Sequence, residues 1–257
     1  MPSTLQTTRI YNNLGYWFLI FVLLAFIGFY KSYFSVLLEP HPTVVHLHFA
    51  FMVIWMGLVI VQPLLIKYKK LSVHRTLGKL SYLVVPLVLI TSAMMTKHSY
   101  FAYKSRLEVQ VVEGLATYTE AEILHLSAYE MGLAFFYFLW LAIFFGLAIY
   151  HRKDRIPHSR YILAAALTFM GPTVDRIFIF WVETFLLWGS IPIEYFAFGL
   201  INVTLIFFLF IDKGNPKGQK ALGISLSIYL IGQILYATVR ETDLWEMMIS
   251  NLVNIGS

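Results

Sequence analysis

Histidine offers the clearest chemistry in this chain of 257 residues. Five of the eight histidines stand at the edges of long apolar segments. His41, His46 and His48 flank the start of one segment, His98 follows the next, and His125 opens the one after that. Imidazole is costly in hydrocarbon and is the commonest metal ligand in proteins. Histidines at one depth on three helices therefore predict a site for a transition metal or a single heme b.

Two of these histidines, His48 and His125, are the leading candidate ligands, and His46 and His98 come next. In a regular helix His46 and His48 point about 200° apart, so both can face one centre only where the backbone is irregular. The prolines just before them would permit such an irregularity. The alternative is that these are interfacial histidines, hydrogen-bonded to backbone carbonyl groups.

A second set of polar residues falls within the apolar segments and is expected to surround the histidine site. An isolated carboxylate in hydrocarbon is expensive, so a buried acid must be protonated, paired or coordinated. Arg176 and Glu183 lie two turns apart on one helical face and could instead belong to a structural ion-pair network. The set comprises Tyr129, Glu130, Asp175, Arg176 and Glu183.

Composition predicts a membrane protein. Hydrophobic residues make up 59% of the chain and charged residues only 13%, which is too little charge for a soluble domain of this size. The net charge of +5 does not indicate a nucleic-acid partner, because the basic residues come in short clusters between apolar runs. The absence of cysteine excludes disulfides, iron–sulfur clusters and thiolate ligands.

Seven segments reach the roughly 20 mainly apolar residues that a membrane-spanning helix needs. We expect a single all-α membrane domain over residues 1–257, built as a bundle of seven transmembrane helices in contact with lipid. The expected spans are about 14–37, 44–66, 76–95, 123–150, 160–188, 193–211 and 221–239.

Lysine and arginine predict the orientation of these spans. The turns after the second, fourth and sixth spans, together with Arg9, hold 13 of the 19 basic residues. Only Asp154 and Asp212 among the acids share that side. Because positive residues are retained in the cytoplasm, we expect a multi-pass protein of the bacterial inner membrane with its N-terminus inside and its C-terminus outside.

The longest outer connection, residues 97–121, is expected to be a loop. Its stretch 106–113 alternates in part like a strand and contains neither proline nor glycine. This loop either folds back as a lid over the outer ends of the helices or is a plain connector.

Three short stretches resemble a widespread group of uncharacterised bacterial multi-span membrane proteins. They are residues 46–55 (HLHFAFMVIW), 62–65 (QPLL) and 74–78 (HRTLG). In that group a histidine-led helix with tryptophan and glutamine is followed by His-Arg-x-Leu-Gly at the next helix. Residues 158–176 are similar to the same group. The resemblance covers about spans two to five and implies an architecture without naming an activity.

Three better-known membrane families do not fit the sequence. Microbial rhodopsins need a lysine inside the seventh span, and residues 221–239 contain none. Seven-span zinc hydrolases need a His-x-x-x-His pair late in the bundle, but no histidine follows His158. Diheme cytochromes need two stacked histidines on one helix, and the histidines within a span here are too far apart for that.

Two functions stay open beside a purely structural or assembly role. In the first, the site binds heme b or a transition metal and supports electron transfer or oxidation of a lipid-soluble substrate such as a quinone. In the second, the protein is not an enzyme, and its polar interior binds or translocates a small hydrophobic or anionic solute, with Arg176 as counter-charge.

Overall fold

The computed structural model describes residues 10–255, and helices form nearly all of it. The longer helices are α2 (Leu14–Tyr30), α3 (Thr43–Lys67), α4 (Leu71–Val112), α6 (Gly132–Tyr150), α9 (Ile193–Ile211) and α10 (Pro216–Val239). The shorter ones are α5 (Glu120–Glu130), α7 (Arg155–Leu167), α8 (Met170–Ile177) and α11 (Asp243–Asn254). A 3-10 turn η1 (Phe34–Val36), a π-helical turn η2 (Phe178–Val182) and an antiparallel hairpin of β1 (Leu186–Leu187) and β2 (Ile191–Pro192) complete the described elements.

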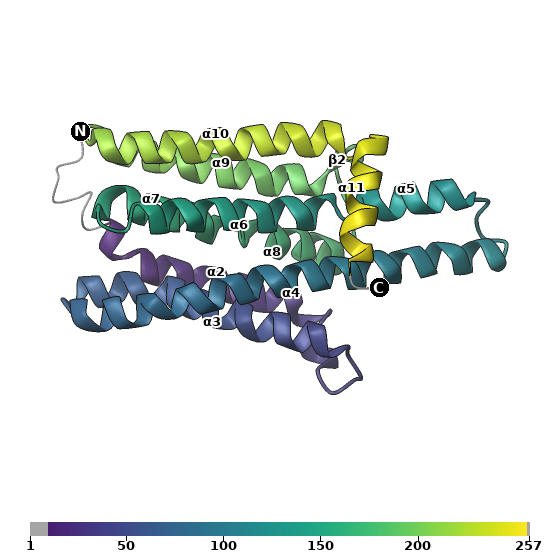
Figure 1. Cartoon of the computed structure of the whole chain (residues 1–257), viewed down its shortest axis with the longest axis horizontal. Coiled ribbons are helices and arrows are strands. Elements are labelled where there is room, and N and C mark those ends of the chain that lie inside the picture. The colour runs from purple at the N-terminus through teal and green to yellow at the C-terminus, as the bar shows by residue number, and fades with distance from the viewer. Residues whose placement is uncertain (1–9, 256–257) are drawn as a thin grey trace.

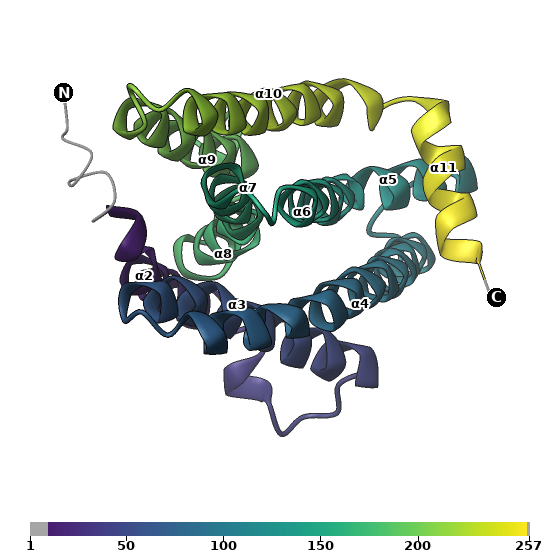
Figure 2. The same ribbon diagram turned by 60° about the vertical axis from the view of Figure 1, so that its left-hand side comes forward.

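The long helices lie along one axis in three layers (Figures 1 and 2). One outer layer holds α9 and α10, the other holds α2, α3 and α4, and the middle layer holds α6, α7 and α8. Helix α7 lies at the centre, where residues 163–167 are all buried. A helix that is apolar on every side belongs in such a position, and the alanines at 164–166 let the neighbouring helices approach closely.

Six helical segments are long and apolar enough to cross a membrane, as expected for an all-α membrane protein. They are Thr43–Lys67, Leu71–Val112, Glu120–Tyr150, Arg155–Val182, Ile193–Ile211 and Pro216–Val239. These six correspond to the second to seventh predicted spans. The first prediction, residues 14–37, corresponds to α2, which is apolar but has only 17 residues. At 1.5 Å per residue its length is about 26 Å, against a hydrocarbon core of about 30 Å.

Helix α2 ends at Tyr30 rather than at residue 37, and Lys31 is its C-cap residue. An ammonium group is costly in hydrocarbon. Here Lys31 Nζ donates a hydrogen bond of 2.7 Å to the Phe180 carbonyl oxygen and lies 4.8 Å from the centre of the Trp181 ring. The chain then turns through η1 toward α3.

Helix α4 has 42 residues and is far longer than the predicted span 76–95. The prediction of a loop over residues 97–121 is wrong for most of that length, because α4 continues to Val112. No glycine or proline interrupts the helix there, and Tyr100 and Leu107, two turns apart, are buried on one face. The end of α4 packs with α5 as a helical hairpin that projects past the bundle instead of folding over it as a lid (Figure 1).

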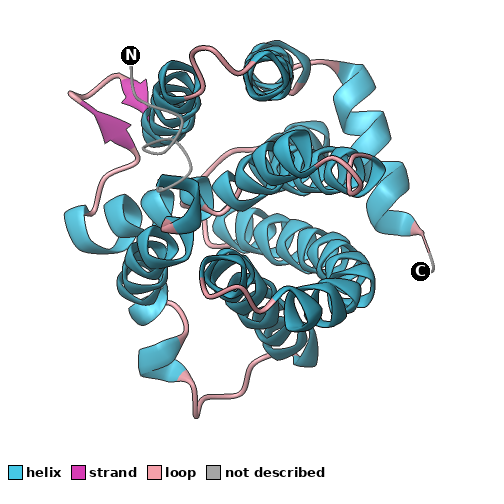
Figure 3. Ribbon diagram, turned by 90° about the vertical axis from the view of Figure 1, so that its left-hand side faces the viewer, coloured by secondary structure: helices cyan, strands magenta, loops and turns pink. Residues whose placement is uncertain are grey.

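Helix α11 was not expected from hydropathy, because its 12 residues are too few to span a membrane. It runs crosswise to the bundle axis (Figures 1 and 3). Trp245, Ile249 and Val253 recur every four residues and are buried, against α5 and α4. The Trp245 indole Nε1 donates a hydrogen bond of 2.8 Å to the Ala128 carbonyl oxygen of α5. This contact fixes α11 across the end of the bundle.

The basic turns after α3, α6 and α9 gather at one end of the bundle, and the α4–α5 hairpin and α11 mark the other end (Figure 1). This arrangement agrees with the charge segregation seen in the sequence. Arg9, which was counted among the same basic residues, lies outside the described part of the chain.

Candidate functional site

The fifth apolar segment consists of three helical pieces, α7, α8 and η2, instead of one continuous helix. The first break, at Thr168 and Phe169, has a local cause. Pro172 has no amide hydrogen, and its ring would clash with the carbonyl group four residues earlier, that of Thr168. The second irregularity is the π-helical turn, a rare element that is frequent at functional sites.

Asp175 lies between these two irregularities, inside the bundle. Its side chain is 5% exposed, and neither carboxyl oxygen has a hydrogen-bond partner among the described residues. The hydroxyl group of Tyr137 on α6 is also buried without a partner. It lies against the α8 backbone, since a Cβ on Gly171 would overlap it. A buried polar atom without a partner costs about 1–3 kcal/mol of stability. The two Asp175 oxygens and the Tyr137 hydroxyl are three such atoms, which indicates a functional site and not a stabilising one.

Arg176, the next residue, lies against α2. Its guanidinium carbon is 4.3 Å from the centre of the Phe29 ring, and its charge interacts with Asp175 and with His48 of α3. Across residues 10–255 no side chain forms a salt bridge or hydrogen bond with this guanidinium. Its five N–H donors are therefore available to a ligand.

A second polar cluster lies between α9, α10 and α5. The Tyr236 hydroxyl donates a hydrogen bond of 2.8 Å to Glu194 Oε1, and Arg240 donates to the Tyr236 oxygen. The Arg240 guanidinium lies 4.1 Å from the centre of the Tyr129 ring, and its Nη2 is 3.7 Å from Glu194. A Cβ at Gly132 would lie 3.3 Å from the Tyr236 ring and 3.4 Å from Arg240 Cδ, so the glycine permits this close packing. Tyr129, expected beside a histidine site, instead packs on an arginine.

The four candidate histidines do not meet at one centre. In the part of the chain that is described, no group of three or more His, Asp or Glu side chains is placed to hold a metal ion. His98 is half-buried on α4. The other three have separate partners: His46 Nδ1 is 2.9 Å from the Tyr33 hydroxyl, His48 Nδ1 is 3.2 Å from Thr91 Oγ1, and His125 Nδ1 is 3.4 Å from Glu246 Oε2.

Two acids of the predicted set lie apart from the interior. Glu183 is exposed and has a left-handed backbone (φ 57°), which ends the π-helical turn. The helical geometry that would have placed it two turns from Arg176 is lost there, so the predicted pairing is wrong. The span expected to reach residue 188 therefore stops at Val182. Glu130 is exposed at the end of α5, next to the interruption at Met131 that separates α5 from α6.

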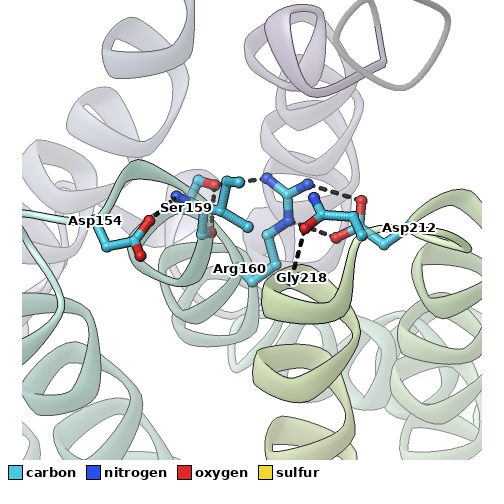
Figure 4. Close-up of polar contacts among 7 residues, drawn as sticks. Asp154, Ser159, Arg160, Asp212 and Gly218 are labelled. Carbon is cyan, nitrogen blue, oxygen red and sulfur yellow. Dashed lines mark hydrogen bonds and ion pairs between the residues drawn. The ribbon is translucent and has the colours of Figure 1, made fainter. Parts of the chain in front are cut away.

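A buried ion pair with two hydrogen bonds, Arg160–Asp212, was missed by sequence reasoning. Arg160 donates two hydrogen bonds of 2.7 Å to the two carboxyl oxygens of Asp212, which is fully buried (Figure 4). The Arg160 guanidinium also stacks on the Tyr11 ring, at 3.5 Å from its centre. A side chain at Gly218 would overlap Asp212. Arg160 and Asp212 lie close to basic turns between spans. In the sequence their charges therefore indicated the orientation of the spans and not an ion pair.

A solvent-exposed ion pair accompanies this buried one at the same end of the bundle. Lys217 Nζ contacts Asp154 Oδ2 at 2.5 Å. The hydrogen bond from Lys217 holds the pKa of the Asp154 carboxyl below its ordinary value. Together the two ion pairs join the start of α7 to the turn between α9 and α10.

The stretches that carry the family resemblance contact each other in the structure. With its amide turned to satisfy both neighbours, Gln62 of α3 donates to His74 Nδ1 and accepts a hydrogen bond of 2.9 Å from the Gly78 amide of α4. Trp55 is 2% exposed and packs edge-on against Phe145. Gln62, His74 and Gly78 therefore join the basic end of α3 to the start of α4, and Trp55 packs α3 against α6.

Comparison of the chain with protein-family models, with curated proteins and with solved structures gives no match. The function is therefore inferred from the geometry of the polar side chains inside the bundle.

Proposed function

We propose that this chain is a multi-pass membrane protein that binds, and moves across the bilayer, a small anionic solute at its broken fifth span. Arg176 would supply the counter-charge. One observation carries the proposal: between a break and a π-helical turn lies a buried acid, Asp175, without hydrogen-bond partners among the described residues, next to the half-buried Arg176. Interrupted helices at membrane depth carry substrate sites in many transporters, because irregular backbone is tolerated only where it lines a site.

The chemistry of the three side chains suits a carboxylate or a similar anion. The Arg176 guanidinium can donate two parallel hydrogen bonds to a planar anion. Asp175, when protonated, and Tyr137 can each donate one more. Exclusion of water strengthens all of these interactions. Of the two functions that the sequence left open, this one fits better, because the four candidate histidines do not gather around one centre in the described part of the chain.

We further propose that α2 is a seventh span and that the basic end of the bundle faces the cytoplasm of a bacterium. The gathering of three basic turns at one end supports this orientation. The apolar surface of α2, where Trp17, Leu23 and Phe26 are exposed, suits contact with lipid.

Melting temperatures of the detergent-purified protein test the solute site. We expect benzoate, acetate or phosphate to raise the melting temperature, because a ligand at a hundredfold its Kd adds about 2.7 kcal/mol to stability. Arg176→Gln should abolish the shift. Arg240→Gln, which removes another interior arginine, should retain it. The proposal fails if no anion shifts the wild-type protein or if Arg176→Gln responds as the wild type does.

The same preparation tests the competing proposal that His48, His125, His46 and His98 hold heme or a metal and support redox chemistry with a quinone. A Soret band, or a stoichiometric metal that is lost in His48→Ala and His125→Ala, would favour it. We expect no Soret band, and no bound metal that is lost in His48→Ala or His125→Ala.

A further inference from the structure

Two histidines, His41 and His46, lie close to each other at the end of the bundle opposite the basic turns. His41, in the connection between η1 and α3, and His46, in the first turns of α3, have ring centres 5.7 Å apart. Both rings pack around Tyr33, at 5.9 and 5.8 Å. Tyr33 is buried and in turn packs on Phe49 at 4.4 Å. The connection that carries His41 stands at the margin of the bundle (Figure 2).

Each of these imidazoles uses one nitrogen for a hydrogen bond and leaves the other without one among residues 10–255. His41 Nε2 is 2.9 Å from the Val36 carbonyl oxygen. A carbonyl only accepts, so Nε2 carries the hydrogen and Nδ1 carries the lone pair. His46 Nδ1 is 2.9 Å from the Tyr33 hydroxyl. In the tautomer in which Nδ1–H donates to the Tyr33 oxygen, Nε2 carries the lone pair. Metal-binding histidines in proteins are held in this way by a carbonyl or another oxygen at the far nitrogen.

The separation of the rings matches two ligands of one ion. With metal–nitrogen bonds of about 2.0–2.1 Å, two imidazoles on one ion place their ring centres about 5–6 Å apart. The observed 5.7 Å lies in this range, and the rings are nearly perpendicular at 81°. Both side chains are half-buried, so water can complete the coordination.

We propose that His41 and His46 form a two-histidine site for a divalent transition-metal ion, with Cu2+ as the favoured ion and Tyr33 as the residue that positions His46. Neutral imidazole nitrogens suit copper, nickel and zinc, and copper binds nitrogen ligands most strongly of the three. This site is separate from Asp175 and Arg176, so it does not rest on the proposed solute binding.

The experiment is a Cu2+ titration of the full chain, purified in detergent and stripped with a chelator, with glycine as a competing ligand. We expect one Cu2+ per chain and the pulsed-EPR signature of two imidazole nitrogens. His41→Ala and His46→Ala should each lose the two-nitrogen signature. Tyr33→Phe should weaken binding about tenfold while keeping it, because it removes only the group that orients His46.

Three control variants make the outcome decisive. His48→Ala, His125→Ala and Arg176→Gln should bind Cu2+ like the wild type, and metal-free melting curves of every variant exclude misfolding as the cause of a loss. The proposal is overturned if His41→Ala and His46→Ala bind as the wild type does, which would mean adventitious copper. It is overturned equally if the loss occurs in His48→Ala or His125→Ala instead.

Discussion

Two buried acids, Asp175 and Asp212, differ in what surrounds their carboxyl groups. Asp212 accepts two hydrogen bonds from Arg160, whereas the oxygens of Asp175 accept none among the described residues. Removal of one partner of a buried ion pair leaves an uncompensated charge and costs about 3–5 kcal/mol. Removal of an unsatisfied polar group instead relieves about 1–3 kcal/mol. The two acids should therefore respond to the same substitution in opposite directions.

We expect Asp175→Leu to raise the melting temperature in detergent and Asp212→Leu to lower it sharply. Asp175→Leu should at the same time lose the anion-dependent shift, since a functional group held at the expense of stability shows this combination. The double variant Arg160→Leu/Asp212→Leu should recover most of the stability lost in Asp212→Leu, because no buried charge is left alone. A lower melting temperature for Asp175→Leu would mean that Asp175 is a structural acid.

At this scale the sequence predicted some interior residues and missed others for identifiable reasons. Asp175 and Arg176 stand out because charged residues are rare in an apolar segment. Tyr137 gave no signal, since it sits in a run of phenylalanines and its pattern there is that of one more apolar aromatic residue. Glu183 was misplaced because its position was predicted from a regular α-helix. In the structure the π-helical turn ends at Val182, and Glu183 has a left-handed backbone.

Among the helices, the break in the fifth span is the feature with the most direct test. Proline at the third position of α8 does no harm to that helix, because the first turn has no intrahelical use for the missing amide hydrogen. It does prevent α7 from continuing into α8. Pro86 differs in that it lies in the middle of α4, which continues on both sides of it without interruption.

We expect Pro172→Ala to slow hydrogen exchange in the segment 168–173, measured by mass spectrometry, because the new amide can donate to the Thr168 carbonyl oxygen. A continuous helix would also reorient Asp175 and Arg176, so the anion-dependent melting shift should fall. Pro86→Ala is the matched control and should leave both measurements nearly unchanged. Unaltered exchange in Pro172→Ala would show that Pro172 does not cause the break.

The positions of most helices followed from hydropathy, but several helix ends did not. Hydropathy detects only the part of a helix that is apolar enough for lipid, and α4 continues for more than four turns beyond residue 95 by packing with α5. Hydropathy did not predict helix α11 for the same reason, since its apolar residues form a stripe along one face and not a continuous run. The spans 44–66 and 193–211, which lie wholly within apolar sequence, agree with α3 and α9 to within one residue.

For the whole molecule, the open question is whether the chain crosses the membrane six or seven times. Six spans, from α3 to α10, are enough to place the basic turns on the cytoplasmic side, as the positive residues require. Helix α2 then decides only the side of the N-terminus: inside if α2 crosses, outside if it lies along the membrane surface. Because α2 packs along both α3 and α8 in the bundle, we expect it to cross.

Single-cysteine variants test this topology cleanly, because the chain has no cysteine of its own. A membrane-impermeant maleimide should label the outer positions in intact spheroplasts and the inner positions only after lysis. The outer positions are Glu113 and Ser190, and the inner ones are Asn12, Lys70, Lys153 and Lys217. Labelling of Asn12 from outside, with the other five unchanged, would reduce the count to six spans. Labelling of Lys70, Lys153 or Lys217 from outside would overturn the orientation itself, since the positive residues would then lie on the wrong side.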